Sequence, residues 1–312
     1  MDRTFSKLGK GSLRGSIFAL CASAIGSGVL SLPYVLGLCG YGLGMLFMML
    51  GATAAEISLR MLAHLAVKHK MPNYSKIAIK AGGQGLNILL SVMILLFMFG
   101  SCISYQIIVT SLFKYVYLQF KNGDEFAETK LFAIYQSVPT ALLLLLPLSL
   151  KRDMSAFRYV SLASIGALLY TGIVLIVELP KYYSYYMDHK EEYNVQVKFG
   201  FFDLDMLTGC AMTFFAFQCQ VQLLPIYSEL VNPEYRRVVK VIDRAITVDL
   251  FFYATIAIAG YLSSFNNTAK IVLERKQLPD DQGKPDYPIL IAVIAVIGSI
   301  LVAFPVAYNP FR

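Results

Sequence analysis

Residues 24–34, AIGSGVLSLPY, combine glycine, serine and proline in the middle of an apolar stretch. The surrounding stretch, residues 15–36, is long enough to cross a bilayer. Gly26 and Gly28 are poor helix formers and Pro33 follows them, so we expect the helix to break here. A break frees backbone N–H and C=O groups, which hydrocarbon cannot satisfy but a ligand or a wet cavity can. The spacing therefore indicates a binding site for a small molecule, or alternatively a small-residue face for close helix packing.

A second apolar stretch, residues 206–228, contains three glutamines that alternate with apolar residues. Gln218, Gln220 and Gln222 are two residues apart, and such neighbours point about 200° apart on an α-helix. The three amides cannot share one helix face, so at least one would meet lipid, where polar groups are costly. A local unwinding at 215–222 would turn several of these groups inward. The alternative is that one glutamine pairs with a neighbouring helix.

Ionisable side chains within apolar stretches are rare, so each one is a candidate for a functional role. Asp249 is either a titrating group inside the membrane or the ion-pair partner of a nearby base such as Arg244. Glu56, Arg60 and His64 are four residues apart, on one helix face. Because these three lie near the end of their stretch, a structural ion pair is the favoured interpretation.

The composition is typical of a membrane protein. Hydrophobic residues make up 57% of the 312 residues and charged residues 15%, with a mean hydropathy of +0.60. The net charge of +7 comes from basic residues in short loops between apolar stretches, so we do not expect nucleic-acid binding. The five cysteines show neither CxxC nor metal-ligand spacing, and we expect no metal site or disulfide framework.

Eight apolar stretches are long enough to be transmembrane helices, which predicts an all-α membrane protein. They cover residues 15–36, 40–63, 87–113, 131–149, 157–179, 206–228, 245–264 and 287–307. A cytoplasmic N-terminus puts 17 of the 27 basic residues but only 7 of the 20 acidic residues inside, as the positive-inside rule requires. Residues 1–14 are then a cytoplasmic tail and 15–312 the transmembrane domain. Asn266, in an Asn-Asn-Thr sequon, falls in an outer loop and is a candidate glycosylation site.

Two motifs carry a family resemblance. GSGVLSLPYVLGLCGYGLG at 26–44 resembles the first-helix signature of the amino acid/auxin permease family. FAFQCQVQLLPIYSEL at 215–230, with NPEYRR at 232–237, is similar to the family's sixth helix and following loop, and most resembles the sodium-coupled neutral amino acid transporter branch. The resemblance covers most of residues 12–312. It implies a LeuT-like fold, in which helices one to five and six to ten form inverted repeats and helices one and six are broken.

The family usually has eleven spans, whereas this sequence has eight. The resemblance therefore implies that the second repeat is incomplete and that the sequence is C-terminally truncated, either as a fragment or as a natural eight-span protein. We expect a fragment.

The resemblance also implies where a substrate binds. Half-helix N-termini at the two breaks would direct positive dipole ends at a carboxylate. Amides at Gly26–Gly28 would hold this carboxylate, and carbonyls near Phe215–Phe217 would accept from the amino group of an α-amino acid. The predicted substrate-binding residues are Ile25, Gly26, Ser27, Gly28, Phe215, Ala216, Phe217 and Gln220.

A coupling cation is expected near the first break. The predicted residues are Ala22, Ile25, Ser299 and Asp249. In the sodium-coupled branch an Asn stands at the position of Ala22 and threonines at those of Leu301 and Ala303, so side-chain oxygens that suit Na⁺ are missing here. Backbone carbonyls around Ala22 and Ile25 remain available, and Gln220 replaces a His of that branch. These departures favour H⁺ over Na⁺ as the coupling ion, and no other cofactor is expected.

The expected function is secondary active transport of neutral L-amino acids by alternating access. The partners are then an amino acid substrate and the lipid bilayer of the plasma membrane or a vacuolar or lysosomal membrane. An enzyme is not expected, because the sequence has no HExxH or GxSxG motif and no histidine at the centre of a span. The alternative is an amino-acid-sensing or non-transporting membrane protein on the same fold.

Overall fold

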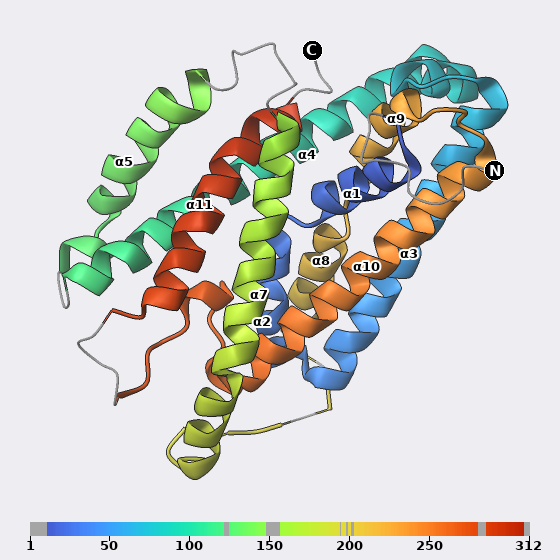
Figure 1. Ribbon diagram of the computed structural model, residues 1–312. Coiled ribbons are helices and arrows are strands. Elements are labelled where there is room, and N and C mark those ends of the chain that lie inside the picture. Colours follow the sequence, from blue (N-terminus) through green and yellow to red (C-terminus); the bar gives the residue numbers. More distant parts are fainter. Residues whose placement is uncertain are drawn as a thin grey trace.

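The computed structural model describes residues 11–121, 125–147, 157–193, 195–197, 199–200, 203–279 and 285–308, and over these residues the protein is helical and has no strand (Figure 1). The α-helices are α1 (Leu13–Ala24), α2 (Leu32–Cys39), α3 (Tyr41–His69), α4 (Tyr74–Phe120), α5 (Lys130–Pro139), α7 (Phe157–Asp188), α8 (Asp205–Ala216), α9 (Gln220–Glu229), α10 (Tyr235–Leu262) and α11 (Tyr287–Tyr308). Short 3-10 segments are η1 (Ser27–Ser31), η2 (Glu125–Glu128), η4 (Phe265–Asn267) and η5 (Val272–Glu274), and η3 (Thr140–Leu145) is a π-helical turn. The predicted all-α class is confirmed for this part of the chain.

Five helical segments of the described chain are long and apolar enough to cross a membrane. They are α3, α4, residues Ala163–Asp188 of α7, the pair α8–α9 and α10. A sixth is obtained when Leu13–Ala24 and Gly28–Cys39, bent by 50° at the break between them, are taken as one span. The predicted eighth span falls on α11, whose apolar part Tyr287–Leu301 is shorter than these segments. The predicted fourth span falls on α5–η3, which is not among them. The structure thus supports five or six spans, and the count of eight stays a prediction.

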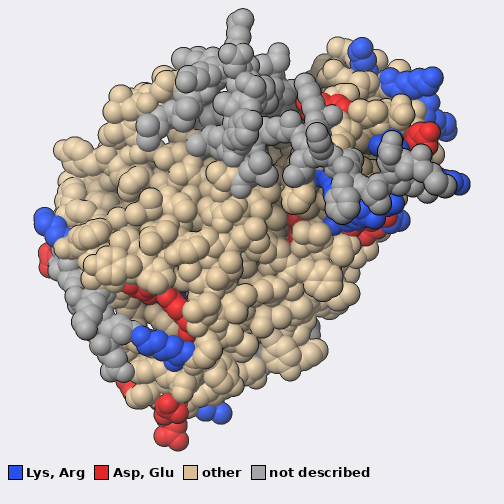
Figure 2. All heavy atoms as spheres, in the orientation of Figure 1, with Lys and Arg blue, Asp and Glu red and all other residues tan. Residues whose placement is uncertain are grey.

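The surface is that of a membrane-embedded bundle. Figure 2 shows charged side chains gathered toward opposite ends of the molecule, with a wide uncharged belt between them. On α4, large apolar side chains such as Leu95 and Phe99 are exposed, as expected of a helix that faces lipid. Before this apolar part, α4 is kinked at Gly82 and Gly83, where Gly83 adopts the left-handed φ of +73° that glycine tolerates.

Helix α10 is the centre of the core. It packs against α1, α2, α3 and α7, and Figure 1 shows it running beside α3. Its approach to α2 requires a glycine, because a Cβ at Gly260 would lie 2.5 Å from Cγ of Pro33. The buried face of α10 carries mostly apolar side chains, but also Asp249 and Tyr253. These two polar residues therefore face the broken first span rather than lipid.

Candidate functional site

The first span is broken where the sequence predicts it. Helix α1 ends at Ala24, and the N–H of Ile25 donates to the Cys21 carbonyl at 2.7 Å. Gly26 then takes an extended conformation, with φ −118° and ψ −161°, before the chain turns into η1. Gly26 and Gly28 thus lie outside any α-helix, Gly26 in an extended conformation and Gly28 in η1. A ligand site made of main-chain groups requires such non-α-helical backbone.

The sixth predicted span is also broken. Helix α8 ends at Ala216 and α9 begins at Gln220, so the predicted unwinding falls on residues 217–219. The first residue of α9, Gln220, is half-buried and contacts two neighbours. The Tyr74 hydroxyl donates to the Gln220 carbonyl, and Gln220 Nε2 donates to Ser58 Oγ at 3.0 Å. Both alternatives considered for the glutamines therefore occur together, unwinding of the helix and pairing of one amide with a neighbouring helix.

The two breaks meet. A Cβ added at Gly28 would lie only 3.1 Å from the Cα of Ala216, so the breaks are in backbone contact. The Tyr253 hydroxyl of α10 lies 2.6 Å from the carbonyl oxygen of Ala24 and 2.9 Å from that of Ala216. These carbonyls belong to the last residues of α1 and α8, where helix carbonyls lack their normal partners. A single buried hydroxyl therefore joins both broken ends.

Sequence analysis missed Tyr253. The available signal was its position four residues after Asp249, on the same face of one helix, because a phenolic hydroxyl at the middle of a span must find an acceptor. The tyrosine is fully buried, and its ring packs against Phe217 with 4.8 Å between the ring centroids.

Asp249 is fully buried beside the breaks, and within the part of the chain that the structure describes neither carboxylate oxygen has a hydrogen-bond partner. The carboxyl group interacts with the Cys21 thiol of α1, and Cys219 of the second break lies within electrostatic range. The alternative pairing with Arg244 is wrong, since Arg244 is exposed and makes no ion pair with Asp249. The ion pair on this part of α10 is instead made by Asp243.

The other predicted substrate residues divide into buried and open ones. Ile25, Ala216 and Phe217 are buried in the core. Phe215 is more open and lies 6.2 Å from Phe97 of α4, measured between ring centroids. The side chain of Ser27 lies outside the described residues. These positions surround the contact between the breaks, and their role in binding stays a prediction.

The predicted cation residues are only partly brought together. Ala22 is half-buried in α1, close in sequence to the first break. Ser299 Oγ donates to the Ala295 carbonyl of its own helix at 2.9 Å, and α11 packs mainly against α7 and α4 rather than α1. Among the four predicted cation residues, Asp249 is the one whose side chain the structure places beside the breaks as an unpaired carboxyl group, within the part of the chain that is described.

A narrow crevice lies between α4, η3 and α11. It is too narrow to admit water. Its lining residues are Tyr105, Gln106, Val109, Leu145, Ile300 and Leu301. The Tyr105 hydroxyl would lie 3.9 Å from a Cβ at Gly26, so α4 contributes a polar group beside the first break.

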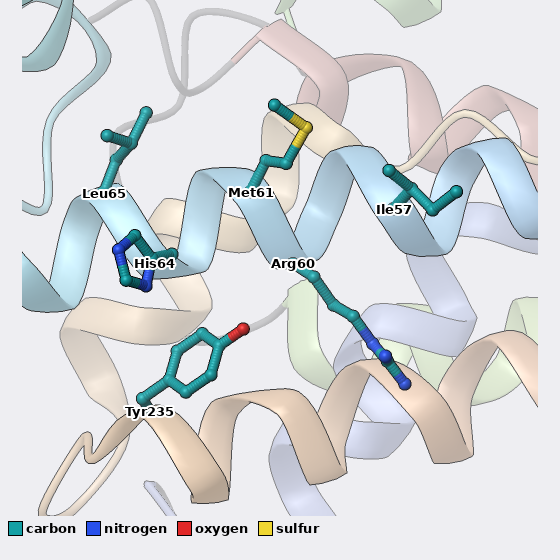
Figure 3. A pocket seen from close by; sticks show the side chains of 6 residues that line it. All are labelled: Ile57, Arg60, Met61, His64, Leu65 and Tyr235. Atoms are coloured by element: carbon teal, nitrogen blue, oxygen red, sulfur yellow. The ribbon is translucent and has the colours of Figure 1, made fainter.

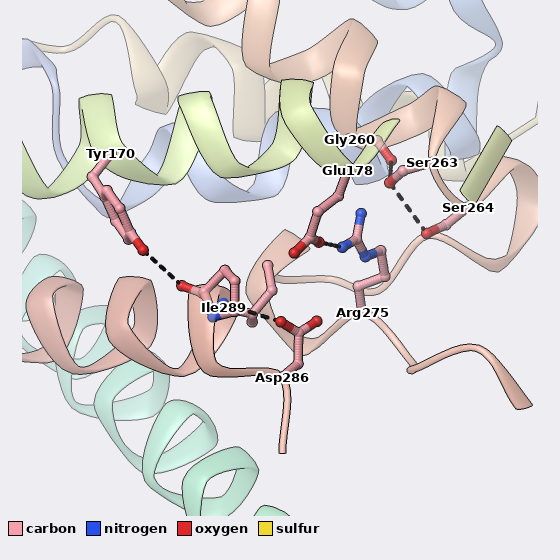
Figure 4. Close-up of polar contacts among 9 residues, drawn as sticks. Tyr170, Glu178, Gly260, Ser263, Ser264, Arg275, Asp286 and Ile289 are labelled. Atoms are coloured by element: carbon pink, nitrogen blue, oxygen red, sulfur yellow. Dashed lines mark hydrogen bonds and ion pairs between the residues drawn. The ribbon is translucent and has the colours of Figure 1, made fainter. Parts of the chain in front are cut away.

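Residues 263–279, called here the covering segment, close one side of the breaks. Its η5 turn packs against η1, α4 and α11. Arg275 is buried and pairs with Glu178 of α7 (Figure 4). Its guanidinium group also lies 3.4 Å above the centre of the Tyr182 ring. The sequon residue Asn266 is exposed in this segment, and its use as a glycosylation site stays a prediction.

A larger pocket, of about 400 Å³, opens between α3 and α10 and is called here the α3–α10 groove (Figure 3). Its lining residues are Ile57, Arg60, Met61, His64, Leu65 and Tyr235. Arg60 pairs with Glu56 at 2.5 Å, which confirms the predicted structural ion pair, and with Asp243 at 2.9 Å. His64 instead packs edge-on against Tyr235. The groove includes none of the predicted site residues.

The chain is similar to known transport proteins. The family model described as "Transmembrane amino acid transporter protein" matches residues 9–312. The chain is 23% identical to "Sodium-coupled neutral amino acid transporter 7" of Danio rerio over 97% of its length, and 26% identical to the Xenopus laevis protein of that name over 94%. It is also 26% identical to human "Solute carrier family 38 member 10" over 83% of its length. The chain spans 63% of each transporter 7 and 22% of the human protein.

Proposed function

The chain belongs to the transmembrane amino acid transporter family, and we propose that it carries neutral L-amino acids across a membrane by alternating access, driven by a cation gradient. The observation that carries this proposal is the contact between two broken helices, with the last carbonyls of α1 and α8 joined by Tyr253. Two broken helices that meet at mid-depth are the expected arrangement in a LeuT-like inverted-repeat transporter, and we propose that fold with eight spans for this sequence.

The substrate would be held by main-chain groups. In the proposal, amides at Gly26–Gly28 bind the carboxylate, and carbonyls at Phe215–Phe217 bind the ammonium group. Every α-amino acid carries both groups, so the side chain must be selected separately. The predicted substrate residues include no charged side chain, which favours an amino acid whose own side chain is neutral.

The coupling ion is proposed to be H⁺ in preference to Na⁺. The names of two relatives state sodium coupling for those proteins. In this chain, however, the positions of Ala22 and Leu301 offer no side-chain oxygen for a hard cation. The unpaired carboxyl group of Asp249 at the breaks further supports a proton.

The proposed orientation puts the N-terminus in the cytoplasm. The covering segment then faces the plasma-membrane exterior or the lumen of a vacuole or lysosome. With Arg275 buried against Glu178, this side is closed, so the structure would represent a state that cannot admit substrate from that side.

Uptake by the purified protein in proteoliposomes tests the proposal. Radiolabelled L-alanine, L-leucine and L-glutamine are supplied under an inward H⁺ gradient, an inward Na⁺ gradient or neither. We expect at least one of them to accumulate, and to do so under the H⁺ gradient. Binding of these amino acids without flux under any gradient would contradict transport and support the sensing alternative.

Gly28→Leu should lower uptake about tenfold or more, because a side chain there must displace the backbone of Ala216, already 3.1 Å from the Cβ position. Gly100→Leu is the matched control, since a Cβ at Gly100 meets nothing within 4 Å. Membrane insertion and monodispersity of both variants are checked first. Normal uptake by Gly28→Leu would contradict the proposed site.

A further inference from the structure

Ala245, Asp249 and Tyr253 follow one another at four-residue intervals along one face of α10. This row of residues contacts the end of α1 and the end of α8. The Ala245 carbonyl accepts from the Cys21 thiol of α1 at 3.7 Å. Eight residues later, the Tyr253 hydroxyl contacts the last carbonyls of α1 and α8. Asp249 lies between Ala245 and Tyr253 on this face, so movement of either break would change the surroundings of its carboxyl group.

No described residue offers a counter-ion to Asp249. Among the described residues, the titratable groups that interact with it are Cys21 of α1, Cys219 between α8 and α9, and Tyr253 on its own helix. Tyr105 of α4 interacts in turn with Tyr253. None of these groups carries a positive charge in either protonation state. Among the described residues, an ionised carboxylate in this closed arrangement would be buried, unpaired and without a hydrogen-bond donor, because the Cys21 thiol donates its one proton to the Ala245 carbonyl.

We propose that Asp249 is the residue that binds the coupled proton, and that Tyr253 is a positioning residue that ties the two helix breaks to it. This inference rests on the proposed transport function. In the closed arrangement the carboxylate has taken up one proton and is a neutral acid. When the breaks separate and water reaches Asp249, the proton leaves for water and the carboxylate is solvated. The charge of the site thus changes by one unit in each half cycle, without any redox step.

Tyr253 couples the change in protonation of Asp249 to the position of both helix breaks. A hydroxyl has one proton, yet the Tyr253 oxygen lies within hydrogen-bond distance of two carbonyls. The closed arrangement therefore keeps both broken ends against one residue, one turn away from Asp249. Separation of the breaks must remove at least one of the two contacts, and the same movement opens Asp249 to water.

The test separates gradient-driven accumulation from exchange in proteoliposomes with the purified chain, using the labelled amino acids named above. Exchange of internal for external amino acid needs no net movement of protons. Asp249→Asn has the shape of the protonated acid and cannot ionise. We expect it to lose H⁺-driven accumulation about tenfold or more while exchange stays within about twofold of wild type. Asp249→Glu should retain accumulation. Asp243→Asn, which removes a carboxylate from the same helix, is the matched control and should accumulate normally.

The two assays distinguish failure of the proton role of Asp249 from failure of the proposed transport function. H⁺-driven accumulation by Asp249→Asn at the wild-type level would overturn the proton role of Asp249. Wild-type protein that shows neither accumulation nor exchange would instead contradict the proposed function itself. If Asp249→Asn does not yield monodisperse protein, Asp249→Ser is measured in the same way, with the same two outcomes.

Tyr253→Phe tests the positioning role. The ring and its packing against Phe217 are kept, but the hydroxyl that contacts both carbonyls is lost. We expect accumulation to fall severalfold more than exchange, because the breaks no longer move as one unit with Asp249. A merely structural role would lower accumulation and exchange by the same factor, and that result would overturn the assignment.

Discussion

Over the residues that the structure describes, two ion pairs join an arginine to a separate helix, and they differ in burial. In the covering segment, the side chains of Arg275 and Glu178 are 3% and 18% exposed, and the Tyr182 ring covers the guanidinium. In the α3–α10 groove, the side chains of Arg60 and Asp243 are 43% and 41% exposed. The charges are the same, so the difference lies in solvent. A buried pair is expensive to separate, whereas an exposed pair is replaced by water at little cost.

This difference bears on how such a bundle would move. Nη1 of Arg275 is buried without a partner even in the closed arrangement, so loss of Glu178 would leave the cation almost wholly uncompensated. The pair in the covering segment is therefore suited to hold one side closed. The pair in the α3–α10 groove holds α3 beside α10 only weakly, and Glu56 offers Arg60 a second partner on its own helix.

Glu178→Gln is the change with the largest expected effect. It leaves the buried Arg275 without a counter-ion, which should cost about 3–5 kcal/mol of unfolding free energy. Thermal unfolding of the purified protein in detergent measures the loss. The double replacement Glu178→Leu with Arg275→Met is the control and should recover most of the stability, because it removes both buried charges. A single variant that loses less than about 1 kcal/mol would contradict the contrast between the two pairs.

Asp243→Asn should have a much smaller effect. The pair with Arg60 is more than a third exposed, and Arg60 keeps its contact with Glu56. We expect a loss of about 0.2–1 kcal/mol at low salt that shrinks further at high salt. The measurement is the same thermal unfolding, repeated across salt concentrations. A loss as large as that of Glu178→Gln would show that exposure does not separate the two pairs.

The smallest effect is expected from pH, through Glu274 in the covering segment. Burial raises the pKa of the Glu274 carboxyl group above its ordinary value, while a hydrogen bond from Ser111 and the charge of Lys114 act in the opposite direction. The folded state thus binds the proton more tightly than the unfolded state. This contribution to stability is fully present below the unfolded pKa and is lost as the pH rises through the folded pKa.

Limited proteolysis of the covering segment across this pH range measures the effect. Cleavage should become faster as the pH rises, and Glu274→Gln should flatten the response. Glu125→Gln, which changes an exposed carboxyl group in η2, is the matched control and should leave the response unchanged. Identical pH profiles for wild type and Glu274→Gln would show that another group controls the segment.

Much of the fold was predictable because hydropathy and backbone chemistry are local. The break at Gly26–Gly28 follows from glycine in a span, and the break at 217–219 follows from three amides that cannot share one face. The pairing of Glu56 with Arg60 follows from a spacing of four residues on a helix. Each of these three features can be predicted from a few neighbouring residues in the sequence.

The rest depends on which helices pack together, which spacing within one helix does not reveal. The contact of Tyr253 with Ala24 joins residues 229 positions apart, and that with Ala216 joins residues 37 apart. Arg275 looks like an ordinary loop cation in the sequence, and only the fold of the covering segment buries it against α7. The partner of Arg60 on α10 is Asp243, whereas Arg244 next to it is exposed. A shift of one position along α10 thus separates a side chain that contacts α3 from one that is exposed.

A cryo-electron microscopy structure of the purified protein with a transported neutral amino acid tests the central claim most directly. We expect density for the ligand at the two breaks, with its carboxylate at the amides of Gly26–Gly28 and its ammonium group at the carbonyls of Phe215–Phe217. Density in the α3–α10 groove instead, with the contact between Gly28 and Ala216 unchanged, would contradict it.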